Sequence, residues 1–353
     1  MLGDDQLSTY NQKRVEDILG RYRDRVVDTM RAAIDRPRIG HAALMRYHLG
    51  WQDAEGKAIA ATGGKMLRPA LCLLCCEAAG GEAARALPAA AAIELVHNFT
   101  LIHDDIEDNS DTRHGRETLW RVAGIAQAIN AGDGMFVIAQ RTLLDLETTG
   151  VSAERVLAAS RLLNDACAAL CEGQYADIGF ETRETVARSE YESMIAGKTA
   201  ALLGASAAIG AIAGGGDDPT VAALGECGRL LGLAFQIQDD VLGIWGVAAV
   251  TGKPVADDIR SRKKSFPVVW ALEHADADAR ARLRQIYREL AMSDRDVDEA
   301  LTLLEASGAR DIAMSEARRW ADRALAEIAP LPIDAERRRD LEALAAFFVQ
   351  RTA

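Results

Sequence analysis

The chain has 353 residues, and 49% of them are hydrophobic, which is enough for a large core. A net charge of −12 leaves no overall basic surface to neutralise phosphates, which excludes a general nucleic-acid-binding role. Alanine and leucine dominate, aromatic residues make up 5%, and alternating Val, Ile and Thr runs are nearly absent, so the composition favours helices.

The N-terminus lacks a basic region followed by an apolar one, so no signal peptide is predicted. Apolar residues from Val15 to Met30 recur at helical spacing and predict a first helix, which Pro37 ends. A less regular stretch follows, as far as Gly63-Gly64. Further helices are predicted at 68–79, 86–108, 119–146, 153–180, 188–213, 220–246, 265–275, 278–290, 296–306, 310–328 and 334–351. We therefore expect one all-α domain.

The most apolar stretch runs from Thr199 to Gly216 and is built of alanine and glycine. A buried, closely packed helix explains it better than a transmembrane span, and no transmembrane segment is predicted. The six cysteines fit no zinc pattern and no disulfide framework, so they are interpreted as core residues of a protein in a reducing cytoplasm.

Two acidic pairs stand in apolar surroundings. Asp104 to Asp108 read DDIED after FTLIH, and Asp239-Asp240 stand in FQIQDDVLG. Residues four apart share a helix face, so Asp104 and Asp108 project together although like charges there repel. Mg²⁺ would offset that repulsion, because it binds one or two carboxylates together with substrate phosphates. A DDxxD motif by itself is usually a solvated helix face, but the second pair favours a metal–diphosphate site.

Basic residues gather at several places between and after these motifs. They are Lys65 and Arg68 in GGKMLRP, Arg113 and His114 just after DDIED, Lys198 before the small-residue helix, Lys253 in TGKPVADD, and the run Arg260, Arg262, Lys263 and Lys264. Arginine grips phosphate with a planar fork, and the glycines before Lys65 let the backbone approach a ligand. Each cluster taken alone also fits a solvated loop. Together they predict phosphate-bearing substrates with apolar remainders.

The order of these motifs resembles the trans-isoprenyl diphosphate synthases, the polyprenyl synthetase family, and most of all its short-chain geranylgeranyl members. The resemblance covers roughly residues 40–351 and rests on GGKMLRP, ELVHNFTLIHDDIEDNSDTRHG, GQYAD, Lys198-Thr199, FQIQDD, GKPVADD, KKSFP and FFVQR. It implies a single large helical bundle with a central cavity spanning residues 1–353, of which 1–35 form an N-terminal helical region. It also implies a homodimeric prenyltransferase that joins isopentenyl diphosphate to an allylic diphosphate head to tail.

The resemblance implies roles for individual residues as well. Three Mg²⁺ ions, for which Mn²⁺ can substitute, would be held by Asp104, Asp105, Asp108, Asp239 and Asp240. The allylic diphosphate would contact Arg113, Lys198, Gln236, Lys253 and Lys263. Isopentenyl diphosphate would bind Lys65, Arg68, His97 and His114, with Phe235 packed on its hydrocarbon part. Lys198, Thr199 and Gln236 would steady the allylic carbocation, which is electrostatic stabilisation of charge that develops in the transition state.

The sequence departs from the family pattern at several positions. His114 stands where a second arginine is often found, and Gly243 stands where the second acidic motif often has a third aspartate. Met66 replaces a frequent basic residue, Glu117 a usual proline and Ala256 a usual glycine. None of these removes an indispensable ligand, although His114 could retune the isopentenyl site.

Product length is predicted from the residues that precede DDIED. Phe99 stands five residues before Asp104 and Thr100 four before it. A bulky ring one to two helical turns below the metals would form a floor, and a small residue at 100 would leave room above it. By resemblance this pattern fits a C20 product, with C15 and C25 as alternatives. The other interpretation of Phe99 is an ordinary core aromatic.

Three rival interpretations remain in view. A class I terpene cyclase would carry NDxx(S/T)xxxE, and Asn164, Asp165 and Glu172 have that spacing, although Ala168 replaces the hydroxyl residue. The predicted second diphosphate site at Lys65, Arg68 and His97 argues against it. A non-catalytic partner subunit would typically lose an aspartate cluster, which this chain keeps. A structural or nucleic-acid-binding helical protein leaves both acidic pairs unexplained.

Overall fold

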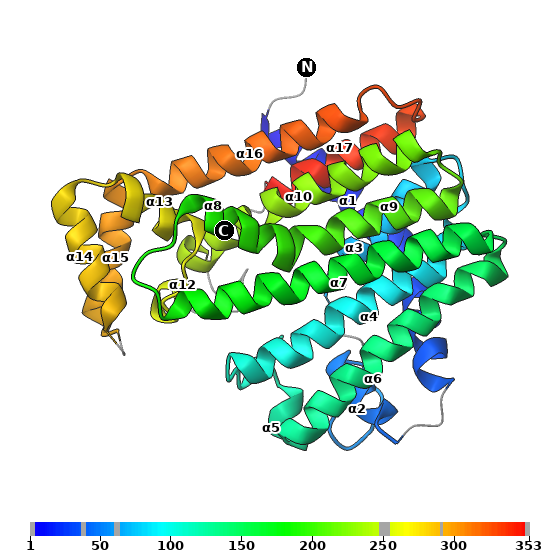
Figure 1. Cartoon of the computed structure of the whole chain (residues 1–353), viewed down its shortest axis with the longest axis horizontal. Helices are drawn as coiled ribbons and strands as arrows, with labels where there is room; N and C mark the ends of the chain where they lie inside the picture. Colours follow the sequence, from blue (N-terminus) through cyan, green and yellow to red (C-terminus); the bar gives the residue numbers. More distant parts are fainter. Residues whose placement is uncertain (1–3, 37–39, 60–63, 247–254, 290–291, 350–353) are drawn as a thin grey trace.

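The computed structural model describes residues 4–36, 40–59, 64–246, 255–289 and 292–349. As the composition predicts, the described chain is almost entirely helical (Figure 1). The helices are α1 (Asp4–Asp35), α2 (Ala42–His48), α3 (Leu67–Ala78), α4 (Ala83–Glu107), α5 (Leu119–Ala123), α6 (Ile125–Leu144), a 3-10 turn η1 (Asp145–Thr149), α7 (Ala153–Glu181), α8 (Arg188–Ile195), a π-helical turn η2 (Ala196–Ala200), α9 (Ala201–Gly214), α10 (Asp218–Trp245), α12 (Asp257–Arg260), α13 (Phe266–His274), α14 (Ala277–Arg288), α15 (Asp294–Ala306), α16 (Ala309–Ile328) and α17 (Ala335–Val349). Two short strands, β1 (Thr112–Arg113) and β2 (Arg116–Glu117), form an antiparallel hairpin.

Helix α9 forms the centre of the bundle. It packs against α3, α7 and α10, and nearly all of its residues are buried (Figure 1). A Cβ atom at Gly210 would lie 2.0 Å from the carbonyl oxygen of Cys72, and one at Gly228 would lie 2.6 Å from that of Leu203. Small residues therefore let the backbones of α3, α9 and α10 approach closely.

The apolar segment is a core helix, as predicted. Among the described residues, Arg188–Gly214 is long and apolar enough to cross a membrane, but 72% of its most apolar window is buried inside the protein. All six cysteines are free, and Cys171 on α7 is the exposed one. The buried helix and the free thiols agree with the expectations drawn from the sequence, but Cys171 is not the core residue that was expected.

Most predicted helices are present, but the short helix α12 and the β1–β2 hairpin were not predicted, and three further segments differ. The segment 119–146 is not one helix, because Gly124 adopts a φ of 80° and separates α5 from α6. The segment 188–213 is interrupted by the π-helical turn η2. The stretch after Pro37 contains α2, which has only seven residues and escaped prediction. That residues 1–353 form one domain stays a prediction.

The two ends of the described chain lie together. Helix α1 packs against α17, and the fully buried carboxylate of Asp340 on α17 forms ion pairs with Arg14 (2.6 Å) and Arg21 (3.2 Å) of α1. Removing both arginines would leave the Asp340 carboxylate buried without an ion-pair partner, so these contacts help to fix α17 on the bundle. The same two helices contribute to the wall of the main cavity.

Candidate active site

A cavity of about 1140 Å³ lies among α1, α3, α4, α9, α10 and α17. Its wall includes thirteen residues that the sequence singles out, drawn from segments far apart in the chain. These are Lys65, Arg68, His97, Thr100, Asp104, Arg113, His114, Lys198, Thr199, Phe235, Gln236, Asp239 and Lys263. Apolar residues such as Leu101, Leu170 and Leu202 complete the wall. The predicted acidic and basic groups therefore share one large, partly apolar cavity.

Helix α4 presents one face to this cavity. Glu94, His97, Leu101 and Asp104 follow one another at spacings of three and four residues and all line it. Burial raises the pKa of Asp104 to about 6, which its neighbour Asp108 reinforces and Lys198 opposes. Asp108 follows the last residue of α4 and is exposed at its end.

Asp105 points away from the main cavity, toward the hairpin. It is 1% exposed and accepts a hydrogen bond from Nε of Arg113 (2.9 Å), with Nη2 of Arg113 at 2.8 Å from the same oxygen. Its second oxygen is buried with no partner among the described residues. Asp105 thus holds Arg113, a predicted diphosphate ligand, at the cavity wall. We assign it this supporting role rather than direct contact with a metal in the cavity.

The second acidic pair divides in the same way. Asp239 is exposed to the cavity, whereas Asp240 is fully buried. The oxygens of Asp240 accept hydrogen bonds from Tyr191 Oη (2.6 Å), the backbone N–H of Phe266 (2.8 Å), Gln236 Nε2 (3.1 Å) and Lys263 Nζ (3.2 Å). With both oxygens occupied by protein donors, Asp240 orients its neighbours. That Asp240 also binds a metal stays a prediction.

The space for a third aspartate on α10 is taken by a residue from another element. A Cβ atom at Gly243 would lie 2.3 Å from Oδ2 of Asp258, the second residue of α12. Asp258 is 7% exposed, lines the cavity, and lies 3.7 Å from Nζ of Lys263. The departure at Gly243 thus makes room for Asp258, which the sequence analysis did not single out although it lies within GKPVADD.

Lys198 and Thr199 lie in the π-helical turn η2, a type of irregularity that is common at functional sites. Nζ of Lys198 donates a hydrogen bond to Asp177 of α7 (2.6 Å). Burial by itself would lower the pKa of Lys198, but Asp177 and Asp104 together raise it, so the ammonium stays charged. Asp177 is a second residue that the sequence analysis missed, although it ends the quoted GQYAD.

A chain of hydrogen bonds connects two of the three predicted catalytic residues, Thr199 and Gln236, to Lys263. Oγ1 of Thr199 donates to Oε1 of Gln236 (2.6 Å), and Nε2 of Gln236 donates to Asp240, which also accepts from Lys263. Burial opposes the charge of Lys263, yet the carboxylates led by Asp240 and Asp258 raise its pKa well above the usual value. Gln236 and Lys263 are therefore held rigidly at the wall. Lys253, the remaining predicted ligand, lies outside the described residues.

Lys65 and Arg68 add positive charge to the cavity wall, and Glu94 lies in the same wall and acts on Arg68. Burial lowers the pKa of Arg68, and its Nε atom is buried with no hydrogen-bond partner among the described residues. Burial followed by the charges of Arg68 and Arg113 lowers the pKa of His97 well below the usual value. Nζ of Lys65 lies 5.2 Å from the ring of Phe347 on α17, and the Phe235 ring packs edge-on against Phe348 at 5.4 Å. A multivalent anion is the natural occupant of such a place.

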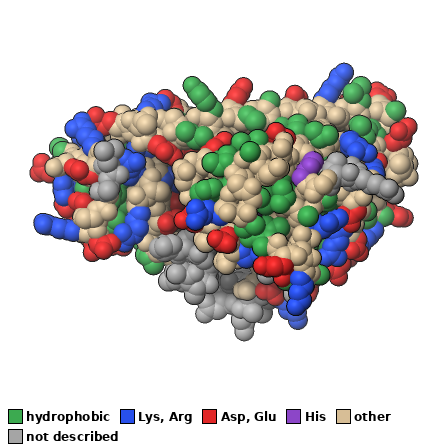
Figure 2. Space-filling view, turned by 90° about the horizontal axis from the view of Figure 1, so that it is seen from below, with side chains coloured by type: hydrophobic (Ala, Val, Ile, Leu, Met, Phe, Trp, Pro, Cys, Tyr) green, Lys and Arg blue, Asp and Glu red, His purple; other side chains and the backbone are tan. Residues whose placement is uncertain are grey.

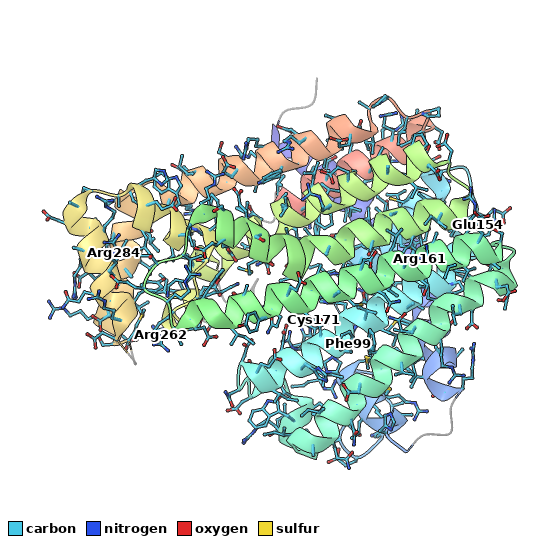
Figure 3. All side chains as sticks on the ribbon, in the orientation of Figure 1. Phe99, Glu154, Arg161, Cys171, Arg262 and Arg284 are labelled. Atoms are coloured by element: carbon cyan, nitrogen blue, oxygen red, sulfur yellow. The ribbon has the colours of Figure 1, made fainter. Side chains whose placement is uncertain are left out.

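Phe99 lies on the side of α4 that faces α6, and its role as the floor of the product site stays a prediction. Phe99 is five residues from Asp104, or 1.4 helical turns, so the two side chains leave α4 in different directions. Its ring packs edge-on against Phe136 of α6 (5.1 Å) and His103 (5.7 Å), and it is not among the residues that line the main cavity (Figure 3). Thr100, in contrast, lines the cavity with 9% of its surface exposed.

The residues present fit Mg²⁺ bound together with phosphate. Asp104 and Asp239 supply carboxylates from two helices to one cavity. In the part of the chain that the structure describes, no three His, Cys, Asp or Glu side chains converge into a ready metal cage. This suits an ion that takes one or two carboxylates and completes its shell with water and substrate phosphates.

The cyclase motif has no place in this cavity. Asn164, Asp165 and Glu172 are exposed on α7, and none of them lines the cavity. The amide nitrogen of Asn164 donates to Gln140 of α6 (3.1 Å) and to the carbonyl of Ser160 (2.8 Å). The structure therefore gives no support to the terpene cyclase alternative.

Comparison with known proteins agrees with this geometry. The polyprenyl synthetase family model matches residues 51–304, well over half of the chain. A geranylgeranyl diphosphate synthase from Mycobacterium tuberculosis is 43% identical over 90% of this chain and 89% of its own length. A (2E,6E)-farnesyl diphosphate synthase from the same organism is 39% identical over 97% of this chain and 94% of its own. The crystal structure of a polyprenyl synthetase from Streptomyces coelicolor superposes with a TM-score of 0.89 at 39% identity, covering 95% of this chain and 99% of that one.

The protein is thus an all-α prenyltransferase with the fold of the prenyl synthases. It belongs to the polyprenyl synthetase family. Relatives of this similarity make products of different lengths, so membership alone does not fix the product.

Proposed function

We propose that this protein condenses isopentenyl diphosphate with allylic diphosphates, head to tail, and that its main product is geranylgeranyl diphosphate (C20). The observation that carries the proposal is one cavity whose wall holds the carboxylates of Asp104 and Asp239 on two helices together with the cations of Lys65 and Arg68. One substrate diphosphate fits the carboxylates through bound metal, and a second fits the cations directly. Such a cavity serves a reaction that joins two diphosphates.

The residues of the chain have distinct tasks in this reaction. Asp104 and Asp239 would hold Mg²⁺, of which three ions are expected and for which Mn²⁺ can substitute, and the metal would supply positive charge that favours loss of the diphosphate. Arg113, Lys198 and Lys263 neutralise the departing group from the protein side, and Asp105, Asp177 and Asp240 hold these cations in position. A role for Lys253 in the same task stays a prediction.

The carbocation needs protection as well as charge balance. Thr199 and Gln236 line the cavity and are hydrogen-bonded to each other, and their side-chain dipoles would steady the allylic cation. The C3–C4 double bond of isopentenyl diphosphate then attacks it, and the proton lost from C2 passes to the released diphosphate. The apolar wall at Leu101, Leu170 and Leu202 limits the water that would quench the cation.

The first test is a product assay. The purified protein is incubated with Mg²⁺, isopentenyl diphosphate and either the C5, C10 or C15 allylic diphosphate, and the dephosphorylated products are sized by mass spectrometry. A metal-dependent C20 alcohol is expected, and EDTA should abolish it. A C15 or C25 alcohol would correct the chain length alone. A cyclic product from an allylic substrate without isopentenyl diphosphate would overturn the proposal in favour of a cyclase.

Chain length gives a direct prediction at Thr100. Because this side chain lines the cavity just below Asp104, Thr100→Phe should fill the space that the growing chain occupies. We expect the main product to shorten from C20 to C15, as measured by mass spectrometry. Phe99→Ala tests the floor predicted from the sequence and should lengthen the product if that ring is the floor. An unchanged length in Phe99→Ala together with a shortened one in Thr100→Phe would assign the control of length to the cavity face.

A homodimer is proposed from an exposed apolar face. Large apolar side chains are exposed along α6 and α7, which contact each other; they are Ile125, Ile129, Val137 and Leu144 on α6 and Leu157, Tyr175 and Ile178 on α7. Figure 2, seen from the end of the molecule where α2 and α5 lie, also shows hydrophobic side chains gathered in the middle of that face. Exposed apolar surface of this extent marks an interaction site.

The dimer is tested at Val137, which is 56% exposed on α6. Val137→Arg is expected to shift the protein from dimer to monomer, because a charge cannot be buried unpaired in an apolar interface. Light scattering coupled to size exclusion measures the mass. The matched control is Ile312→Arg on α16, away from this face and 36% exposed, which should leave the mass unchanged. A monomeric wild-type protein would contradict the proposal.

The compartment is the last part of the proposal. All six cysteines are free, and five of them are buried. Such a protein suits a reducing environment, and we propose that it acts in the cytoplasm.

A further inference from the structure

Helix α2 brings a histidine to the wall of the main cavity. His48, the last residue of α2, lines the main cavity together with Arg68, His97 and Arg113. It also lines a small pocket under the β1–β2 hairpin, next to His114 and Arg116.

The position of His48 is fixed by contacts between α2 and the hairpin. Arg116 donates hydrogen bonds to the carbonyl oxygens of Tyr47 (2.8 Å) and Gln52 (2.9 Å), and its guanidinium lies 4.2 Å from the centre of the Tyr47 ring. The Tyr47 hydroxyl donates to the carbonyl of Glu117 (2.8 Å). The residue next to Tyr47 is therefore held against the hairpin that carries Arg113 and His114.

Asn98 of α4 also lines the cavity, and its side chain favours the charged form of the His48 imidazole. Nδ2 of Asn98 donates hydrogen bonds to the carbonyl oxygen (2.8 Å) and to the carboxylate (3.3 Å) of Glu94. The backbone at His48 is therefore held against the hairpin before any substrate arrives, and preorganisation of this kind favours ligand binding.

The surroundings of His48 are strongly positive. Burial lowers its pKa to about 3, and the charges of Arg113, His114 and Arg116 reinforce this effect, while Asn98 opposes it. Nearby, Arg68 keeps a buried Nε atom with no hydrogen-bond partner among the described residues. Cations and imidazoles that crowd together in this way are relieved by a multivalent anion.

We propose that His48 is a further ligand of the diphosphate of isopentenyl diphosphate and compensates for the histidine that stands at position 114 in place of an arginine. The inference rests on the proposed function and deepens it. An arginine at 114 would reach the diphosphate with a long, permanently charged side chain. The shorter His114 side chain leaves part of that task unfilled, and His48 supplies a donor from the other side of the hairpin.

The test is the binding of isopentenyl diphosphate by isothermal titration calorimetry in EDTA, where the metal-dependent allylic site is silent. His48→Leu is expected to raise Kd about tenfold or more, the usual effect of losing one hydrogen bond to a charged group. His48→Asn, which keeps a donor of similar size, should lose less. His41→Leu changes the histidine just before the start of the same helix and outside the cavity, and it should stay within about twofold of wild type.

Steady-state kinetics separates contact with the substrate from a structural role. In His48→Leu the KM for isopentenyl diphosphate should rise while the KM for the allylic diphosphate and kcat at saturation stay near the wild-type values. In a His114→Arg background the same change should cost less, because the arginine takes over the contact. Wild-type affinity in His48→Leu, equal rises in both KM values, or no binding by the wild type in EDTA would each overturn the inference. A protein that binds isopentenyl diphosphate but makes no product would instead count against the proposed function.

Discussion

Replacing Asp104 with asparagine is expected to abolish turnover and at the same time to stabilise the metal-free protein above pH 6. Asp104 faces the cavity, and its burial raises the pKa of its carboxyl group from 3.8 to about 6. At neutral pH the folded protein therefore contains a buried, charged carboxylate that lowers its stability. Asparagine has nearly the same shape and carries no charge, so the cost of burying the anion disappears together with the metal ligand.

The sign and the pH range follow from this raised pKa. Below pH 4 the carboxyl group is protonated in both the folded and the unfolded chain, and the two proteins should be equally stable. As the pH rises through about 4 to 6, the unfolded chain releases its proton first, so the wild type loses stability relative to the variant. A shift of about two pKa units corresponds to at most about 3 kcal/mol in the free energy of unfolding.

Denaturant unfolding in EDTA at pH 4 and pH 8 measures this difference. Activity with Mg²⁺ should fall by about 10³-fold or more, because the ligand supports charge that develops in the transition state. Added Mg²⁺ and inorganic pyrophosphate should raise the Tm of the wild type and leave the variant nearly unchanged. Asp108→Asn is the matched control, since Asp108 is exposed and its removal should change stability by less than about 0.5 kcal/mol. An Asp104→Asn variant that is less stable than the wild type at pH 8 would contradict the prediction that the buried carboxylate is destabilising.

The helices and most of the cavity wall could be predicted from the sequence, because both depend on spacing along one helix. Residues 94, 97, 101 and 104 line the cavity as a single face of α4, which the period of the α-helix dictates. The charged motifs also come together as expected, since a metal–diphosphate site is the simplest reason for carboxylates and cations on otherwise apolar helices.

The rotation of each helix about its own axis, which decides the residues that face the cavity, could not be predicted from the sequence. Consecutive residues of a helix point about 100° apart, so one aspartate of a pair faces the cavity and the other packs against protein. The sequence alone does not indicate which aspartate of the pair faces the cavity. Here Asp239 faces it, while Asp240 is buried and accepts hydrogen bonds from four donors. The same rotation takes Phe99 to the side of α4 that faces α6.

Contacts between segments far apart in the chain could not be predicted from the sequence either. Asp258 fills the space beside Gly243, fifteen positions earlier in the sequence, and no pattern in either segment indicates that they meet. Helix α2 has seven residues, too few to show a helical period, so His48 was left in an irregular stretch. Tertiary packing decides both positions.

Gly173→Ala is expected to damage stability and catalysis together, although it adds one methyl group far from any predicted ligand in the sequence. A Cβ atom at Gly173 of α7 would lie 2.2 Å from the backbone nitrogen of Lys198, and 2.8 Å from both its Cα and the carbonyl oxygen of Met194. These are backbone atoms, which cannot move aside as the end of a side chain can. To accommodate the methyl group, either α7 or the turn η2 must therefore shift.

The cost should appear in two measurements. Overpacking of a well-filled core typically costs about 1–3 kcal/mol, which denaturant unfolding can resolve. Because η2 carries Lys198 and Thr199, the shift also displaces the ammonium that meets Asp177 and the hydroxyl that meets Gln236. A misplacement of about 1 Å in such a site can lower the rate by about 10²-fold, so kcat should fall in the fraction that remains folded.

Gly179→Ala is the matched control for this change. Gly179 is on the same helix, it is exposed, and a Cβ atom there would meet nothing within 4 Å. Alanine should stabilise the helix at this position by about 0.5–1 kcal/mol and leave kcat as it is. If Gly173→Ala behaved like Gly179→Ala, the close packing of α7 on η2 would not be what positions Lys198. If it lost stability but kept kcat, the turn would have to recover its geometry after α7 moves away, and the π-helical turn itself would then hold the catalytic residues in place.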